Sequence, residues 1–108
     1  MAFKNARLAV TTSYSAIYTC PENTVAVVIG LQAANIDGTA NADITVQWRD
    51  ASASNVSTLL ANTVTVPADA SIGLLAGKLV LEAGDNLRAL ASANGDIDLT
   101  ASILEIAV

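Results

Sequence analysis

The side chains in this sequence that could do chemistry are few. The chain contains no histidine, which is the commonest general base and metal ligand and a partner in Ser–His and Cys–His pairs. Cys20 precedes Pro21 at a predicted strand end, with no cationic side chain or base beside it in the sequence to stabilise a thiolate. We interpret Cys20 as a packed thiol. The glycines follow no phosphate-binding pattern, so the sequence predicts a non-enzymatic protein with no catalytic residues and no cofactor.

One pair of acids could bind a cation. Asp96 and Asp98 follow Asn94-Gly95, and a period of two places both carboxylates on one face of a strand. Such a pair could bind calcium or act as acid and base. The glycine precedes the acids here, so the calcium-loop pattern is absent, and we interpret them as solvated acids. Asp96 and Asp98 remain the only candidate metal ligands, and Asp43 and Asp85 are interpreted as turn-flanking or solvated acids.

Trp48 is the residue that could stack on a sugar ring. It belongs to the same alternating set as Ala42, Ile44 and Val46, which predicts a place in the core. The alternative is an exposed stacking platform, which would suit a carbohydrate-binding module. The chain has one tryptophan, two tyrosines and one phenylalanine, a thin supply for binding carbohydrate or single-stranded nucleic acid.

The charge distribution excludes two classes of partner. The net charge is −5, and the five basic residues are scattered singly along the chain. Nucleic acid and anionic membranes both require clustered Lys and Arg, so neither is a predicted partner. Charged residues make up only 14% of the chain, compared with about 25% in a typical domain. A surface so poor in charge is suited to burial against other subunits.

Length and cysteine content limit the organisation further. A chain of 108 residues predicts one domain over residues 1–108, with an extended N-terminal segment at residues 1–6. A single cysteine allows no disulfide within the chain. The first residues show no apolar signal-peptide core, and the longest apolar run, Val25 to Leu31, is too short to cross a membrane. We therefore expect synthesis in the cytoplasm without secretion by a signal peptide.

A period of two dominates the chain and predicts strands. It is clearest at residues 42–49 and 97–103, where apolar side chains alternate with polar ones. Shorter strands are predicted at Leu8–Thr12, Ala16–Thr19, Thr63–Val66, Lys78–Leu81 and Asn86–Ala91. Turn residues separate them, and Asn94-Gly95 is predicted to join the last two strands directly. The Ala- and Ser-rich segment from Ala51 to Asn55 is predicted as a loop or one helical turn.

Two segments are apolar in a way that suggests an interface. The strand from Val25 to Ala33 carries no charge on either face, with Val25, Val27, Ile29 and Leu31 predicted on one of them. The last strand changes phase at Leu104, which predicts a bulge or an end covered on both faces. The predicted interface residues are Val25, Val27, Val28, Ile29, Leu31, Leu104, Ile106 and Val108.

These elements predict an all-β fold. About seven to eight short antiparallel strands, with turns every 8–12 residues, are typical of a single-domain β-sandwich with a jelly-roll-like arrangement.

Two stretches resemble a known group of proteins. One is Ile17-Tyr18-Thr19-Cys20-Pro21-Glu22-Asn23-Thr24, leading into the apolar strand, and the other runs from Val66-Pro67-Ala68-Asp69-Ala70 to Leu81-Glu82-Ala83-Gly84-Asp85-Asn86-Leu87. Together they resemble small β-sandwich virion proteins of tailed bacteriophages, in which a Tyr-x-x-Pro-Ala segment introduces a long apolar strand and a Leu-x-Ala-Gly-Asp segment enters a late strand. Cys20 and Glu22 depart from the Val and Ala expected there.

The resemblance implies a structural role in the virion. It implies a head decoration (cement) protein that forms a homo-oligomer, here a homotrimer, on the major capsid protein or another virion protein, after synthesis in the host cytoplasm. A neck, collar or tail accessory protein is the alternative within this class. A carbohydrate- or calcium-binding sandwich is the alternative outside it.

Overall fold

Alternation of apolar and polar residues produces the strands, as β4 (Ala42–Asp50) illustrates. Ala42, Ile44 and Val46 are buried on its inner face, because successive side chains of a strand point to opposite sides. The computed structural model describes residues 1–108. Its other elements are β1 (Ala2–Ala9), β2 (Ser15–Thr19), β3 (Thr24–Asn35), a 3₁₀ turn (Ala51–Ala53), β5 (Val56–Val66), β6 (Ser71–Gly73), β7 (Leu79–Leu81), β8 (Asn86–Ala91) and β9 (Ile97–Ala107).

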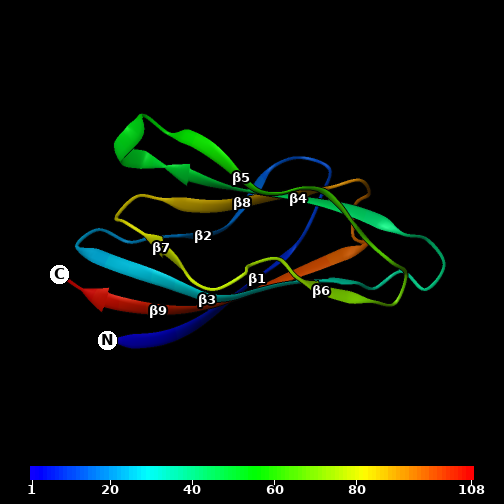
Figure 1. Ribbon diagram of the computed structural model, residues 1–108, viewed down its shortest axis with the longest axis horizontal. Helices are drawn as coiled ribbons and strands as arrows, with labels where there is room; N and C mark the ends of the chain where they lie inside the picture. Colours follow the sequence, from blue (N-terminus) through cyan, green and yellow to red (C-terminus); the bar gives the residue numbers. More distant parts are fainter.

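The strands form two antiparallel sheets that pack face to face (Figure 1). The five-stranded sheet has the order β1-β9-β3-β6, with β7 also paired to β3, and the four-stranded sheet has the order β2-β8-β4-β5. Among the connections, only the one between β4 and β5 joins hydrogen-bonded neighbours, and nearly all the others cross from one sheet to the other. The predicted all-β sandwich of antiparallel strands is therefore confirmed, with nine strands in place of the predicted seven to eight.

The Asn94-Gly95 turn joins β8 to β9 directly, as predicted, but it does not form a hairpin between paired strands. Gly95 has a φ of 77°, a left-handed conformation that glycine adopts readily and that tight turns require. However, β8 pairs with β2 and β4, whereas β9 pairs with β1 and β3. Crossing between the sheets lets both strands bury their apolar faces against one another, and a local turn signal does not specify this choice.

A bulge in β3 changes the predicted faces of that strand. Val28 pairs with Ile103, and Gly30 pairs with Ser102, so Ile29 is the additional residue. Because of this shift, Ala26 and Val28 point inward before the bulge, and Leu31 and Ala33 point inward after it. Leu31 therefore lies on the core face, and not on the face of Val25 and Val27 as the uninterrupted alternation predicted.

β9 keeps one alternation along its length, in contrast to the predicted phase switch. Its register with β1 is continuous up to the pair between Ala2 and Glu105. Ile103 is the last buried apolar residue of the inner face, and Leu104 and Ile106 therefore point outward. These two apolar side chains therefore lie on the outer face of the five-stranded sheet.

Several strand bounds differ from the predictions. β1 covers Ala2–Ala9 in place of Leu8–Thr12, because the segment predicted only as extended pairs fully with β9. β5 begins at Val56, far before the predicted Thr63, and the short β6 has no clear sequence signal. The Ala- and Ser-rich segment contains the single helical turn that was one of its two predicted forms.

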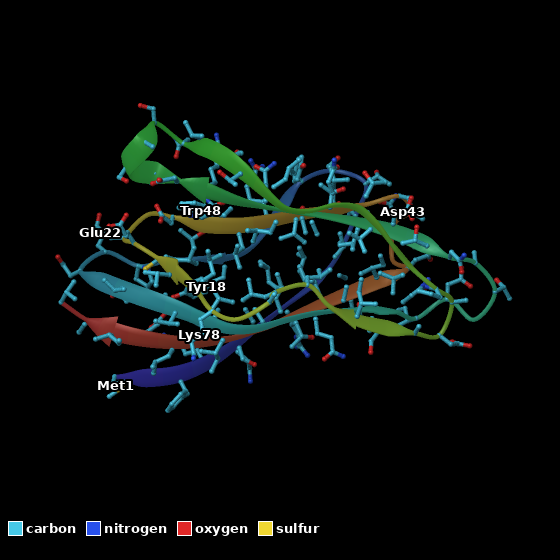
Figure 2. All side chains as sticks on the ribbon, in the orientation of Figure 1. Met1, Tyr18, Glu22, Asp43, Trp48 and Lys78 are labelled. Atoms are coloured by element: carbon cyan, nitrogen blue, oxygen red, sulfur yellow. The ribbon has the colours of Figure 1, made fainter.

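The core lies between the sheets, where side chains from both fill the space (Figure 2). It contains 20 buried hydrophobic residues, and none of them belongs to β1. Asn35 is a buried polar residue whose amide nitrogen donates to the carbonyl oxygens of Ala40 and Val66, each at 3.0 Å. The structure contains no helix with the length and apolar character that a membrane span requires.

The core position of Leu99 gives a first prediction. Leu99→Ala should lower the free energy of unfolding by about 2–5 kcal/mol, because a buried leucine leaves a cavity when it is truncated. The measurement is urea denaturation followed by circular dichroism. Leu59→Ala is the matched control, since Leu59 is 50% exposed on β5, and it should cost less than about 1 kcal/mol. Equal losses in the two variants would contradict the assigned core.

Candidate interaction surface

A row of apolar side chains crosses the outer face of the five-stranded sheet. Phe3 lies opposite Leu104, Leu104 opposite Val27, and Val27 opposite Val80. Residues directly opposite one another in antiparallel strands project from the same face. The row therefore runs without a break over β1, β9, β3 and β7. Beside it, Val25 lies opposite Ile106, and Ile29 is exposed at the bulge.

These side chains are accessible to solvent. Phe3 is 76% exposed and Val80 is 54% exposed, and Ile29 and Ile106 are each close to 40%. Apolar patches of more than roughly a few hundred Å² mark interaction sites on soluble proteins. We name this surface the apolar face, and it consists of Phe3, Val25, Val27, Ile29, Val80, Leu104 and Ile106.

The rest of the same sheet surface is polar. Past the bulge, Arg7 lies opposite Thr100, and Thr100 lies opposite Gln32. Two open hollows of about 580 and 290 Å³ lie on this part, the larger one lined by Arg7, Leu8, Ala9, Asp98 and Thr100. The apolar face is thus confined to one half of the sheet, the half near both chain termini (Figure 1).

The outer face of the four-stranded sheet differs in character. Gln47 lies opposite Arg88 in β8, and Arg49 lies opposite Asn86. The Arg88 guanidinium is 5.6 Å from the centre of the Tyr14 ring, a distance at which a cation is attracted to an aromatic face. The two outer faces therefore offer different chemistry, and only one of them offers a continuous apolar row.

A polar network lies on the side of β1 and β9 that faces away from the apolar face. The Tyr18 hydroxyl of β2 donates to Glu105 Oε2 at 2.5 Å, and Lys4 Nζ of β1 is 2.9 Å from Glu105 Oε1. The hydrogen bond from Tyr18, followed by that from Lys4, holds the pKa of Glu105 below its usual range. Burial, reinforced by Glu105, raises the pKa of Tyr18. The network joins β1 and β9 of one sheet to β2 of the other.

The predicted interface residues divide into three groups. Val25, Val27, Ile29, Leu104 and Ile106 lie on the apolar face, and Val108 is exposed at the C-terminus. Val28 and Leu31 are buried core residues. Phe3 and Val80, the most exposed members of the row, were not predicted, because each is an isolated apolar residue whose neighbours become clear only from the register of four strands.

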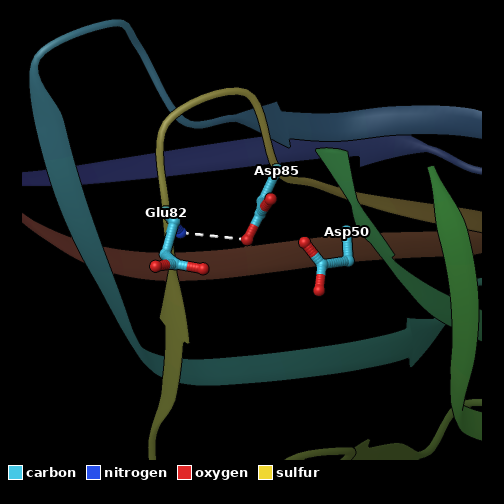
Figure 3. A group of neighbouring side chains, drawn as sticks. All are labelled: Asp50, Glu82 and Asp85. Carbon is cyan, nitrogen blue, oxygen red and sulfur yellow. Dashed lines mark hydrogen bonds between the residues drawn. The ribbon is translucent and has the colours of Figure 1, made fainter. Parts of the chain in front are cut away.

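The two candidate metal ligands do not converge with other ligands. Asp98 projects from the exposed side of β9 and lines the larger hollow. The backbone carbonyl of Asp96 accepts a hydrogen bond from the Ile36 amide at 2.8 Å. A different group of acids does converge, formed by Asp50, Glu82 and Asp85, whose carboxylate oxygens lie within 4.8 Å of one another (Figure 3).

Asp85 has a structural role within that group. It is only 1% exposed, so it flanks a turn as predicted but is not solvated. Its carboxylate accepts from the backbone amides of Ala51 at 2.9 Å and Glu82 at 3.0 Å, and from Trp48 Nε1 at 3.3 Å. Such charge-assisted bonds satisfy a buried carboxylate. They hold the turn before β8 against the hairpin of β4 and β5.

Cys20 is buried, as predicted, whereas the predicted core residue Trp48 is only partly buried. Trp48 is half-buried against the core, and its indole N–H is engaged by Asp85. Cys20 is 1% exposed, and its Sγ is 3.3 Å from the Thr24 carbonyl oxygen. Burial raises the pKa of the Cys20 thiol, which disfavours the reactive thiolate.

No protein-family model matches the sequence, and no curated protein is a significant match. Several solved structures are similar to this chain. One is a protein of Bacillus endospore appendages, which form disulfide-linked pili, with 12% identity and a TM-score of 0.56 over 99% of this chain and 86% of that one. Another is a pentameric capsid protein from metagenomic phage sequences, with 22% identity and a TM-score of 0.48, and this chain spans 62% of its length.

The network around Glu105 predicts a pH dependence. A carboxylate whose pKa is lowered by folding stabilises the protein above its unfolded-state pKa of about 4.5, and this contribution disappears as the pH falls through the lower folded-state value. Glu105→Gln should therefore be less stable than the wild type at pH 7 in urea denaturation, and the gap should narrow as the pH falls below about 4.5. Glu22→Gln, at an exposed position, is the control. A gap that is independent of pH would contradict the assignment.

The burial of Cys20 predicts slow modification. The native protein should react with a thiol-specific reagent on the order of 100-fold more slowly than the urea-unfolded chain, because the reagent needs a local opening and a thiolate. Thr58→Cys in a Cys20→Ala background places a thiol at an exposed position of β5 and should react rapidly in the native state. Rapid native modification of Cys20 would show that it is accessible.

Proposed function

We propose that this chain is a non-enzymatic structural protein of a tailed-bacteriophage virion, a head decoration (cement) protein that acts by self-association and by contact with the major capsid protein. The observation that carries the proposal is the apolar face of the five-stranded sheet. A soluble monomer has no need of an exposed apolar row across four strands, whereas a subunit buries such a row when it assembles.

The energetic argument for assembly is simple. Complete burial of a side chain such as Phe3 contributes about 1.5–3 kcal/mol, and Val80, Ile29 and Ile106 are also exposed on the same face. The row carries no charge, so its burial incurs no cost for desolvating an ion. The polar half of the sheet surface then lies at the rim, where solvent-accessible polar groups are normal in interfaces.

The resemblance in the sequence supports the virion assignment. The Leu81-Glu82-Ala83-Gly84-Asp85 segment has a clear role in the fold, since Leu81 is buried, Gly84 has a φ of 88° and Asp85 holds the turn. A sandwich of the same fold occurs in a protein of pilus-forming appendages, so the scaffold is compatible with a role in assembly. A cement protein of this kind adds buried area across joints between capsid subunits and so resists internal pressure.

We propose a homotrimer as the assembled form. Joints between capsid subunits often lie on three-fold or quasi-three-fold axes, and closed symmetric rings are the common form of homo-oligomers. The apolar face lies at the end of the sandwich that carries both termini (Figure 1). Three copies joined through this end would bury their apolar faces around an axis and leave the four-stranded sheets outermost.

Val80→Glu tests the proposal. A charge at the β7 end of a buried apolar row should weaken self-association by about tenfold or more, because the carboxylate would be desolvated without a partner. The wild type and the variant are compared by light scattering over a dilution series. Leu59→Glu places the same charge at a similarly exposed position on β5, and it should leave the mass unchanged.

A wild-type protein that stays monomeric at high concentration would contradict self-association. A Val80→Glu variant with the mass of the wild type would remove the apolar face from the interface. Binding to purified capsids from which the protein is absent tests the capsid partner, and binding to necks or tails in place of heads would move the protein to a different part of the virion.

A further inference from the structure

The first strand is peripheral to the fold. None of the 20 buried hydrophobic core residues lies in β1, and only Ala6 and Leu8 pack partly against the core. The remaining side chains of the strand are exposed. The strand therefore supplies none of the buried core residues and adds little apolar burial beyond Ala6 and Leu8.

β1 is instead held by specific pairing with β9. The register runs from Ala2 opposite Glu105 to Ala9 opposite Asp98, without interruption. Lys4 adds an ion pair of 2.9 Å to Glu105, and Glu105 is itself fixed by the Tyr18 hydroxyl. The Lys4 side chain is more than half exposed, so this ion pair can open and reform without disturbing the core.

The chain is fixed again immediately after β1. Val10 is fully buried, its amide donates to the Ile97 carbonyl at 2.9 Å, and its carbonyl accepts from the Gly95 amide at 3.2 Å. The Thr12 amide donates to Asn94 Oδ1 at 2.9 Å. The firmly held part of the sandwich thus begins at Val10. Residues 1–9 form an arm that is anchored to it at this residue.

We propose that β1 is an exchangeable strand, which leaves its own β9 and pairs with β9 of a second copy of this chain in the assembled state. This inference rests on the self-association proposed above and states how the copies are joined. Departure of β1 would leave β9 with a long unpaired edge, and exposed edges recruit another strand.

The occupant of that edge is argued from complementarity. The strand that fits β9 at every position of the register, with the Lys4–Glu105 pair in place, is β1 itself. A second copy supplies that strand with identical contacts, so exchange changes few interactions in total. It requires mainly that the backbone turn in a different direction at Ala9. Fully extended, nine residues span about 30 Å, which is enough to reach a neighbour in contact with the apolar face.

Exchange would also extend the apolar row across two molecules. Phe3 of one copy would lie against Leu104 of the other, on the surface that assembly buries. Each copy would then be tied to the next by main-chain hydrogen bonds as well as by apolar contact. The arrangement can close a ring of any small number of copies, because each one gives a strand and receives one.

Disulfide trapping between different chains tests the exchange. Ala6 lies opposite Ala101, which is fully buried beneath the sheet, so only a strand in the β1 position can reach it. Ala6→Cys and Ala101→Cys are made in separate chains, each with Cys20→Ala. The two chains are unfolded together in urea, refolded as a mixture and oxidised with glutathione disulfide, and the cross-linked peptides are identified by mass spectrometry.

The expected result is a covalent heterodimer joined through positions 6 and 101. Arg7→Cys replaces Ala6→Cys in the control mixture, since its side chain projects from the outer face. It should give about tenfold less heterodimer, because a disulfide needs Cβ atoms about 3.5–4.5 Å apart. The double variant with both cysteines in one chain establishes that the pair can oxidise in the folded protein.

Three outcomes are distinguishable when the mass of the reduced proteins is measured in parallel. Oligomers together with the heterodimer support the exchange. Oligomers without the heterodimer, in a protein whose double variant oxidises within the chain, overturn the exchange and leave the proposed function intact. A monomer without the heterodimer overturns both.

Discussion

The pairing of β3 with β9 is the interaction on which the rest of this structure depends. It runs from Thr24 opposite Ala107 to Asn35 opposite Ile97 and forms the middle of the five-stranded sheet. β1 is added to one side of this pair, and β6 and β7 are added to the other. Its bulge at Ile29 determines which residues of β3 face the core. The position and the orientation of the apolar row therefore follow from this one pairing.

Buried polar groups hold the connections between the sheets. Because most connections cross from one sheet to the other, hairpin turns are scarce and the loops need other means of fixation. Asn35 bonds two carbonyl groups of the Ala40 and Val66 segments, and Asp85 bonds two amides and the Trp48 indole. Asn35 and Asp85 are thus both engaged in holding the fold together.

Assembly and the fold are linked through the edge of the five-stranded sheet. The same strand that completes the sheet, β1, carries the most exposed member of the apolar row and contributes nothing to the buried core. A strand of this kind can serve two molecules equally well, because its contacts with β9 depend mainly on register and on one ion pair, and only Ala6 and Leu8 pack partly against the core. Apolar contact and strand pairing then act at the same place.

The sequence by itself determined the all-β fold class and the approximate positions of most strands. Alternation at residues 42–49 and 97–103 specified strands, and turn residues separated them, because period and turn chemistry are local properties. The absence of histidine and of clustered basic residues led to the prediction of a non-enzymatic protein that does not bind nucleic acid. Only the tertiary structure decided which strands pair. It placed Asn94-Gly95 between two sheets, turned Leu31 inward through the bulge, and buried Asp85. It also aligned Phe3, Leu104, Val27 and Val80, which come from four distant strands. Each of these depends on register between segments far apart in the chain, and the period of two within a strand carries no information about its neighbour.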